Sequence, residues 1–93
     1  MEIKYSQHII SRLRIREIEY ELPKIIFEQS KERYYDMKTG YMVAVMNADL
    51  FGKIREVMVA YVMEDEDAKL LTIHPLKEGQ KENREKSRRW RKL

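Results

Sequence analysis

The sequence contains no cysteine, and this absence excludes disulfide bonds and thiolate metal sites. Long apolar runs are also missing. The longest unbroken run, Val57 to Met63, is far too short to span a bilayer. The first residues, MEIKYSQH, lack the apolar stretch of a signal peptide. We therefore expect a soluble, cytoplasmic protein with no membrane partner.

Familiar catalytic signatures are absent as well. The chain has no phosphate-binding glycine loop, no Ser-His-Asp order and no pair of carboxylates at glycosidase-like spacing. It has only two histidines, and their spacing offers no third ligand for zinc. No metal and no other cofactor is expected.

The length of 93 residues fits a single domain with one modest core. Charge is distributed unevenly along it. Residues 77–93 contain eight basic and three acidic residues, which gives a net charge of +5. Residues 1–76 contain eleven basic and thirteen acidic residues, which gives a net charge of −2. We therefore predict a domain over 1–76 and a basic C-terminal tail over 77–93, rich in helix-forming residues. Such a tail favours polyanions, although it could equally serve solubility alone.

The first third of the chain has helical spacing. A short strand at 2–5 precedes Ser6, which can cap a helix whose apolar residues are Ile9 and Leu13. The same spacing continues to Ile26, but Pro23 interrupts it. Proline is best tolerated in a first turn, so we expect two short helices or one bent helix.

The next segments alternate, as strands do. Strands are predicted at 33–36, 41–48, 54–63 and 69–74, separated by turns at 38–40, 49–53 and 64–67. The predicted fold class is α+β: an N-terminal strand and two short helices packed on one face of a four- to five-stranded antiparallel sheet. In the last strand, alternation places Leu71 and Ile73 toward the helices, and Leu70, Thr72 and His74 on the opposite face.

Four residues are candidates for catalysis: His8, Arg12, Thr72 and His74. Arg12 follows His8 by one helical turn, and Thr72 shares a strand face with His74. Two imidazoles could act as general base and general acid near neutral pH, and arginine could hold a phosphate oxyanion. That set suits RNA cleavage without a metal. The alternative is structural, with His8 bonded to the backbone and His74 ending the sheet.

The basic segment supplies candidates for nucleic-acid binding, namely Arg84, Arg88, Arg89, Trp90 and Arg91. Arginine with tryptophan favours phosphate contact and base stacking, although Trp90 could equally fix the tail to the body of the domain. Tyr34, Tyr35 and Tyr41 flank the first hairpin and are weaker candidates for stacking.

The sequence resembles a family of small microbial domains of unknown function, through HIISR (8–12), the REIEYEL segment, GYMVAV and LLTIHP. The resemblance covers residues 4 to about 76. That family is similar in layout to the RelE-like and colicin-nuclease-like ribonucleases of toxin–antitoxin pairs. The resemblance implies helices on one sheet face, RNA on the other, and functional roles at the matching positions His8, Arg12, Thr72 and His74. The basic segment beyond Pro75 departs from the shorter members.

Three functions remain open from the sequence. The chain could be a metal-independent, RNA-cleaving toxin-like enzyme, or a nucleic-acid-binding module without catalysis. It could also be a protein-interaction domain that self-associates or binds an acidic antitoxin-like partner.

Overall fold

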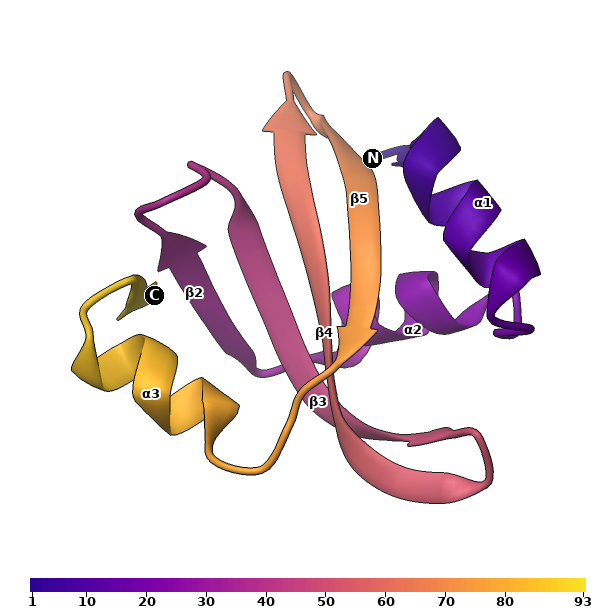
Figure 1. The fold of residues 1–93 in the computed structure, drawn as a ribbon. Coiled ribbons are helices and arrows are strands. Elements are labelled where there is room, and N and C mark those ends of the chain that lie inside the picture. Colours follow the sequence, from indigo (N-terminus) through magenta and orange to yellow (C-terminus); the bar gives the residue numbers. More distant parts are fainter.

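A computed structural model describes all of residues 1–93 and confirms an α+β fold. Three helices and six strands form the molecule (Figure 1). In chain order they are β1 (Ile3–Tyr5), α1 (Gln7–Ile15), α2 (Leu22–Gln29), β2 (Glu32–Asp36), β3 (Met42–Leu50), β4 (Lys53–Glu64), β5 (Asp67–Pro75), α3 (Gln80–Lys86) and β6 (Trp90–Lys92).

All six strands belong to one sheet, in the order β1-β5-β4-β3-β2-β6. Strands β2 to β5 form the predicted antiparallel meander, and β6 adds antiparallel to β2. The prediction of a wholly antiparallel sheet with four to five strands was wrong in two respects. The short β1 pairs in parallel with β5, and the charged C-terminal segment supplies a sixth strand.

The two expected N-terminal helices are separate. The Ser6 hydroxyl accepts a hydrogen bond from the Ile9 amide at 3.0 Å and caps α1, while Pro23 lies in the first turn of α2, where its missing N–H costs nothing. None of the three helices has the length and apolar content needed to cross a membrane.

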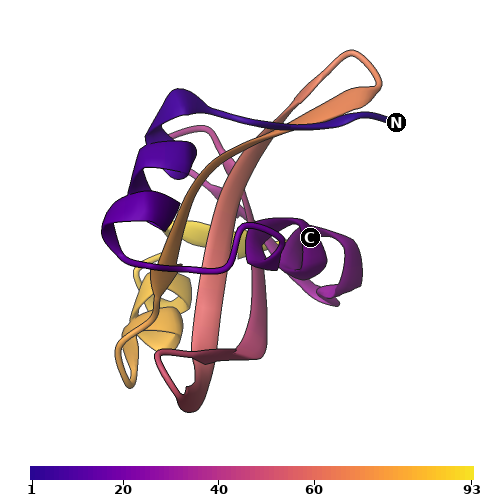
Figure 2. The ribbon, with the colours of Figure 1, turned by 90° about the vertical axis from the view of Figure 1, so that its right-hand side faces the viewer.

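The sequence predicted two N-terminal helices on one face of the sheet, and the structure adds a third helix on the other face. Helix α1 lies beside β5, α2 crosses one face, and α3 lies against the other face (Figures 1 and 2). The larger apolar cluster joins α1 and α2 to the sheet through Ile9, Ile26 and Val59, among others. A smaller cluster on the opposite face contains Tyr34, Met58 and Trp90.

A bulge in β5 changes the predicted alternation. The pairing of β4 with β5 slips between Ala60 and Tyr61, which leaves Leu71 as the extra residue. Leu70 is consequently fully buried on the helix side, contrary to the prediction, and Leu71 is only half-buried. Thr72 and His74, beyond the bulge, still share the opposite face, because both line a cavity there.

Residues 77–93 also differ from the expected tail, because α3 and β6 are part of the fold. Asp36, only 4% exposed, accepts hydrogen bonds from Arg89 Nε (3.0 Å) and Nη2 (3.1 Å), from Trp90 Nε1 (3.3 Å), and from the amides of Lys38 and Thr39. Burial by itself raises the pKa of Asp36, but Arg89 and the two amides outweigh it and lower that pKa from 3.8 to about 2.

Helix α3 has no buried residue of its own and is held mainly by one cation, beside a hydrogen bond from the Tyr34 hydroxyl to Glu85 at 3.3 Å. Lys81 Nζ lies 2.8 Å from Glu56 Oε2 and 3.1 Å from Glu32 Oε2, so it joins the helix to β4 and β2. The hydrogen bond to Glu56, followed by that to Glu32, raises the pKa of Lys81, and the ion pair lowers the pKa of Glu32. Both shifts keep the cluster charged at neutral pH.

We predict that Asp36→Asn lowers the free energy of unfolding by about 3 kcal/mol, the low end for breaking a buried ion pair, because Arg89 keeps some access to water. Denaturant unfolding measures this. Since the folded pKa of Asp36 is depressed, its contribution is present above pH 3.8 and is lost as pH falls toward 2.

The matched control is Asp65→Asn, which removes the same charge from an exposed turn residue at φ 58°, a conformation that asparagine tolerates. It should leave stability unchanged within about 0.5 kcal/mol. Equal stability of the two variants would contradict the anchoring role of Asp36.

Candidate functional site

The candidate site forms where the chain leaves the edge of the sheet. Strand β1 pairs with β5 only as far as Leu70, and the Ser6 amide donates to the Leu70 carbonyl at 2.9 Å. The Ser6 hydroxyl then donates to the Leu71 carbonyl at 2.9 Å, at the bulge. Helix α1 starts at this point and runs beside the second half of β5. One serine therefore fixes the start of α1 against the strand segment that carries Thr72 and His74.

Arg12 and His74, which are 62 positions apart in sequence, are in direct contact. Arg12 Nη2 lies 2.7 Å from His74 Nδ1. Because a guanidinium can only donate, Nδ1 must be unprotonated and accept. A neutral His74 ring then carries its proton on Nε2, which lies 3.4 Å from Thr72 Oγ1 and donates to it. The hydrogen-bond network thus selects one tautomer.

The surroundings of His74 favour its neutral form. Burial, followed by the positive charge of Arg12 and then by His8 and Arg16, lowers the pKa of His74 below its usual 6.5. Burial and then Arg16 also lower the pKa of Arg12, although guanidinium stays protonated at any physiological pH. The pair is a neutral imidazole held by a cation.

His8 lies on the exposed side of α1, close to this pair. A shallow hollow of about 340 Å³ is lined by His8 together with Ser6, Tyr41, Leu71, Thr72 and His74. A second hollow, of about 270 Å³, runs along α1 and is lined by His8, Ser11, Arg12, Ile15 and Arg16. The structure therefore brings together all four residues that the sequence singled out: His8, Arg12, Thr72 and His74.

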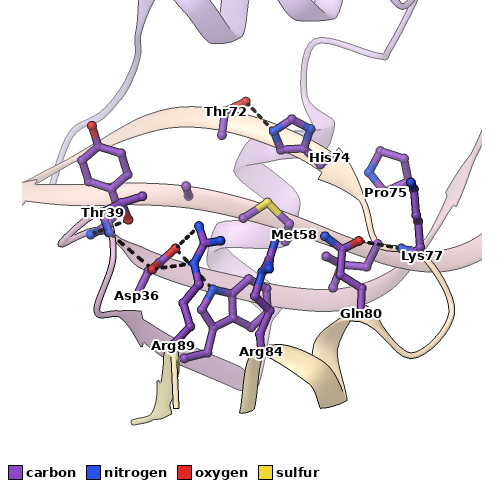
Figure 3. Close-up of a pocket in the computed structure, with 14 residues that line it drawn as sticks. Asp36, Thr39, Met58, Thr72, His74, Pro75, Lys77, Gln80, Arg84 and Arg89 are labelled. Atoms are coloured by element: carbon purple, nitrogen blue, oxygen red, sulfur yellow. Dashed lines mark hydrogen bonds and ion pairs between the residues drawn. The ribbon is translucent and has the colours of Figure 1, made fainter. Parts of the chain in front are cut away.

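Thr72 and His74 also belong to a larger cavity on the same sheet face (Figure 3). Its volume is about 440 Å³, within the range of roughly 300–1,000 Å³ typical of small-molecule sites. In Figure 3, Thr72 and His74 lie on one side, and Gln80, Arg84 and Arg89 extend from α3 and the following residues on the other. The full lining is Asp36, Thr39, Tyr41, Met58, Ala60, Thr72, His74, Pro75, Leu76, Lys77, Gln80, Arg84, Arg89 and Trp90.

The predicted nucleic-acid-binding residues divide into two groups. Arg84, Arg89 and Trp90 line the cavity, whereas Arg88 and Arg91 are exposed elsewhere. Trp90 is 4% exposed and stacks on Tyr34, with ring centroids 5.3 Å apart, so it fixes the C-terminal segment to the sheet. It does not offer a free face to a base. Tyr34 is buried too, and Tyr41 is the exposed tyrosine beside the site.

Sequence reasoning did not identify Asp36, Thr39, Lys77 and Gln80 as part of this site. Gln80 and Lys77 lie in the charged segment, where no pattern separates them from neighbouring residues. Asp36 ends a predicted strand just before a turn, and the only signal was a carboxylate beside an apolar alternating run. No group of three or more His, Asp or Glu side chains is arranged to hold a metal ion.

Searches against protein-family models, curated proteins and solved structures gave no match to this chain.

We predict that His74 titrates below 6.5 and carries its neutral proton on Nε2. Arg12→Ala should raise the pKa of His74, because it removes a nearby charge and the donor that stabilises the neutral ring, while burial keeps the pKa from rising fully. Histidine ring NMR as a function of pH measures both properties. Arg14→Ala, on an exposed position of α1, is the control of equal charge and should change neither.

The same shift affects stability. Because the folded pKa is lowered, the unfolded chain binds more protons just below pH 6.5, so the free energy of unfolding should fall as pH decreases there. A proton on Nδ1, or a pKa unaffected by loss of Arg12, would refute the described network.

Proposed function

We propose that this protein is a metal-independent endoribonuclease of the toxin-like kind, with His8, Arg12, Thr72 and His74 as its active site. The observation that carries the proposal is the contact of Arg12 with His74 at 2.7 Å, beside a hollow that His8, Thr72 and His74 line together. Two imidazoles at one opening, one of them in contact with a guanidinium, are groups that suit phosphodiester transfer without a metal.

The reaction follows from these groups. One imidazole removes the proton of the ribose 2′-OH, and O2′ attacks phosphorus. The P–O5′ bond breaks, and the second imidazole protonates O5′, so that the products are a 2′,3′-cyclic phosphate and a free 5′-OH. His74 is the better base, because its lowered pKa keeps it neutral at physiological pH. His8 is left to protonate the leaving oxygen.

Arg12 has two roles in this proposal. In the free protein it occupies the lone pair of His74 Nδ1. A phosphate is a stronger partner for guanidinium than a neutral imidazole, because both partners are charged. Phosphate binding would therefore draw Arg12 away from Nδ1, leaving the base available at the moment when the substrate is in place. The 2′-OH is the nucleophile, so RNA is the substrate and DNA is not.

We predict that His8→Ala and His74→Ala each reduce cleavage of single-stranded RNA by about 10²–10⁴-fold, the usual contribution of a general acid or base. Cleavage should continue in excess EDTA, and its products should carry 2′,3′-cyclic phosphate ends. Gel analysis of a labelled RNA with end-group identification measures both.

Gln7→Ala, an exposed neighbour of His8 on α1, is the control and should retain wild-type activity. If the wild type and the His8/His74 double alanine cleave at the same rate, the nuclease proposal is wrong. Cleavage of DNA by the wild type would contradict the role of the 2′-OH.

A second candidate function is RNA binding without cleavage. The protein would bind RNA either by itself or in complex with an acidic antitoxin-like partner. The observation that favours it is that Arg12 already occupies the basic nitrogen of His74. The cations Lys77 and Arg84 line the large cavity without any side-chain ion pair, so they can meet phosphates.

For this candidate we predict that the logarithm of the RNA affinity falls linearly with the logarithm of salt concentration. Lys77→Ala should reduce the slope by about 0.7, the value for one phosphate contact on a single strand. Fluorescence anisotropy at several salt concentrations measures the slope. Lys53→Ala, at an exposed position far along the β3–β4 hairpin, should not change it. Salt-independent binding would count against an electrostatic interface.

A further inference from the structure

The large cavity has a chemical bias that the proposed nuclease chemistry does not use. Its floor is apolar and includes Met58, Ala60 and Trp90. Polar groups stand around that floor, and nearly all of those free to bind are donors. This combination of an apolar floor with a polar rim suits a planar ring with polar edges, since such sites bind by burial and a few directed hydrogen bonds.

Three side chains in the rim, Lys77, Arg84 and Gln80, have donors without a partner within the protein. The Arg84 side chain makes no hydrogen bond or ion pair, so its guanidinium fork is free. Gln80 Oε1 accepts from the Lys77 amide at 2.9 Å, which turns the amide NH₂ toward the cavity (Figure 3). The orientation of this amide is therefore set by the backbone, and Gln80 offers a donor to any ligand.

The one carboxylate in the rim is already occupied, and two of the hydroxyl groups already accept one hydrogen bond each. Asp36 receives five donors from Arg89, Trp90, Lys38 and Thr39, more than the four lone-pair positions that a carboxylate presents. Thr39 Oγ1 accepts from the Tyr41 amide, and Thr72 Oγ1 accepts from His74. A ligand that presents acceptors to this cavity therefore meets more free partners than one that presents an amino group.

We infer that the cavity is a nucleobase pocket that selects keto bases, guanine first and uracil second, over the amino bases adenine and cytosine. The guanidinium fork of Arg84 matches the N7 and O6 acceptors of guanine, and Gln80 Nε2 supplies a further donor. Adenine places its N6 amino group, and cytosine its N4 amino group, where guanine and uracil have an oxygen.

The position of the cavity connects it to the candidate active site. Tyr41, Thr72 and His74 line both the large cavity and the hollow beside His8. A nucleotide could place its base over Met58 and its phosphate beside His74 and Arg12. The inference therefore rests on the proposed function for the place of the phosphate, but the base preference itself depends only on the cavity.

Nucleotide binding tests the pocket without requiring cleavage. Trp90 is the only tryptophan and lies in the cavity floor, so its fluorescence should report occupancy by 3′-GMP, 3′-UMP, 3′-AMP or 3′-CMP. We expect 3′-GMP to bind at least fivefold more tightly than 3′-AMP, the low end for one bidentate arginine–guanine contact, and 3′-UMP more tightly than 3′-CMP.

Variants separate the contributions. Arg84→Ala should remove the preference for guanine. Gln80→Glu exchanges a donor for an acceptor of the same shape, so it should weaken 3′-GMP and strengthen 3′-AMP and 3′-CMP. Lys86→Ala removes an equal charge from an exposed position of the same helix and should leave all four affinities unchanged.

Equal affinity for the four nucleotides, or inorganic phosphate competing as well as 3′-GMP, would overturn the inference, because the cavity would then recognise only an anion. An unchanged order of affinities in Gln80→Glu would do the same. RNA cleavage without base preference would refute the nucleobase pocket and support the nuclease proposal. Base-selective nucleotide binding without RNA cleavage would support the nucleobase pocket and refute the nuclease proposal.

Discussion

The buried carboxylate of Asp36 holds the C-terminal part of the fold in place. Residues 77–93 carry a net charge of +5 and would repel one another as a free segment, and α3 contributes no buried side chain. Asp36 gathers Arg89, Trp90 and two backbone amides around one charge, and β6 can then pair with β2. Trp90 completes the apolar cluster on that sheet face. Without this anchor the large cavity would have a floor but no opposite wall, because Arg84, Arg89 and Gln80 all come from the anchored segment.

The candidate active site depends on a different local event, the end of β1 at Ser6. The edge of β5 is covered by a strand as far as Leu70 and by a helix beyond it. The bulge at Leu71 and the two hydrogen bonds of Ser6 to β5 set where this exchange occurs. A bulge increases local twist and re-aims the residues that follow it, here Thr72 and His74. The polar side of α1, with His8 and Arg12, meets them directly.

These two sites differ in how far the sequence predicted them. Helical spacing and strand alternation are local signals, so they predicted α1, α2 and the meander. They also singled out His8, Arg12, Thr72 and His74, which the structure places near one another. The sequence did not predict the bulge, because Leu70 and Leu71 are chemically equivalent and only packing decides which one faces the helices. The sequence also did not predict strand β6 or the large cavity. Their formation depends on Asp36 meeting residues more than fifty positions away, and no short-range pattern encodes such a contact.

In the proposed reaction, the base His74 is masked in the free protein by Arg12. In the free protein, Arg12 on Nδ1 leaves His74 able only to donate through Nε2. In the proposed reaction a phosphate must attract Arg12 before His74 can accept a proton, and the same anion offsets the positive charges of Arg12, His8 and Arg16 that lower the pKa of His74. Substrate binding would thus both free the lone pair and increase its basicity. Activation of this kind needs no change in the fold, only the movement of one half-buried arginine side chain over a few ångströms.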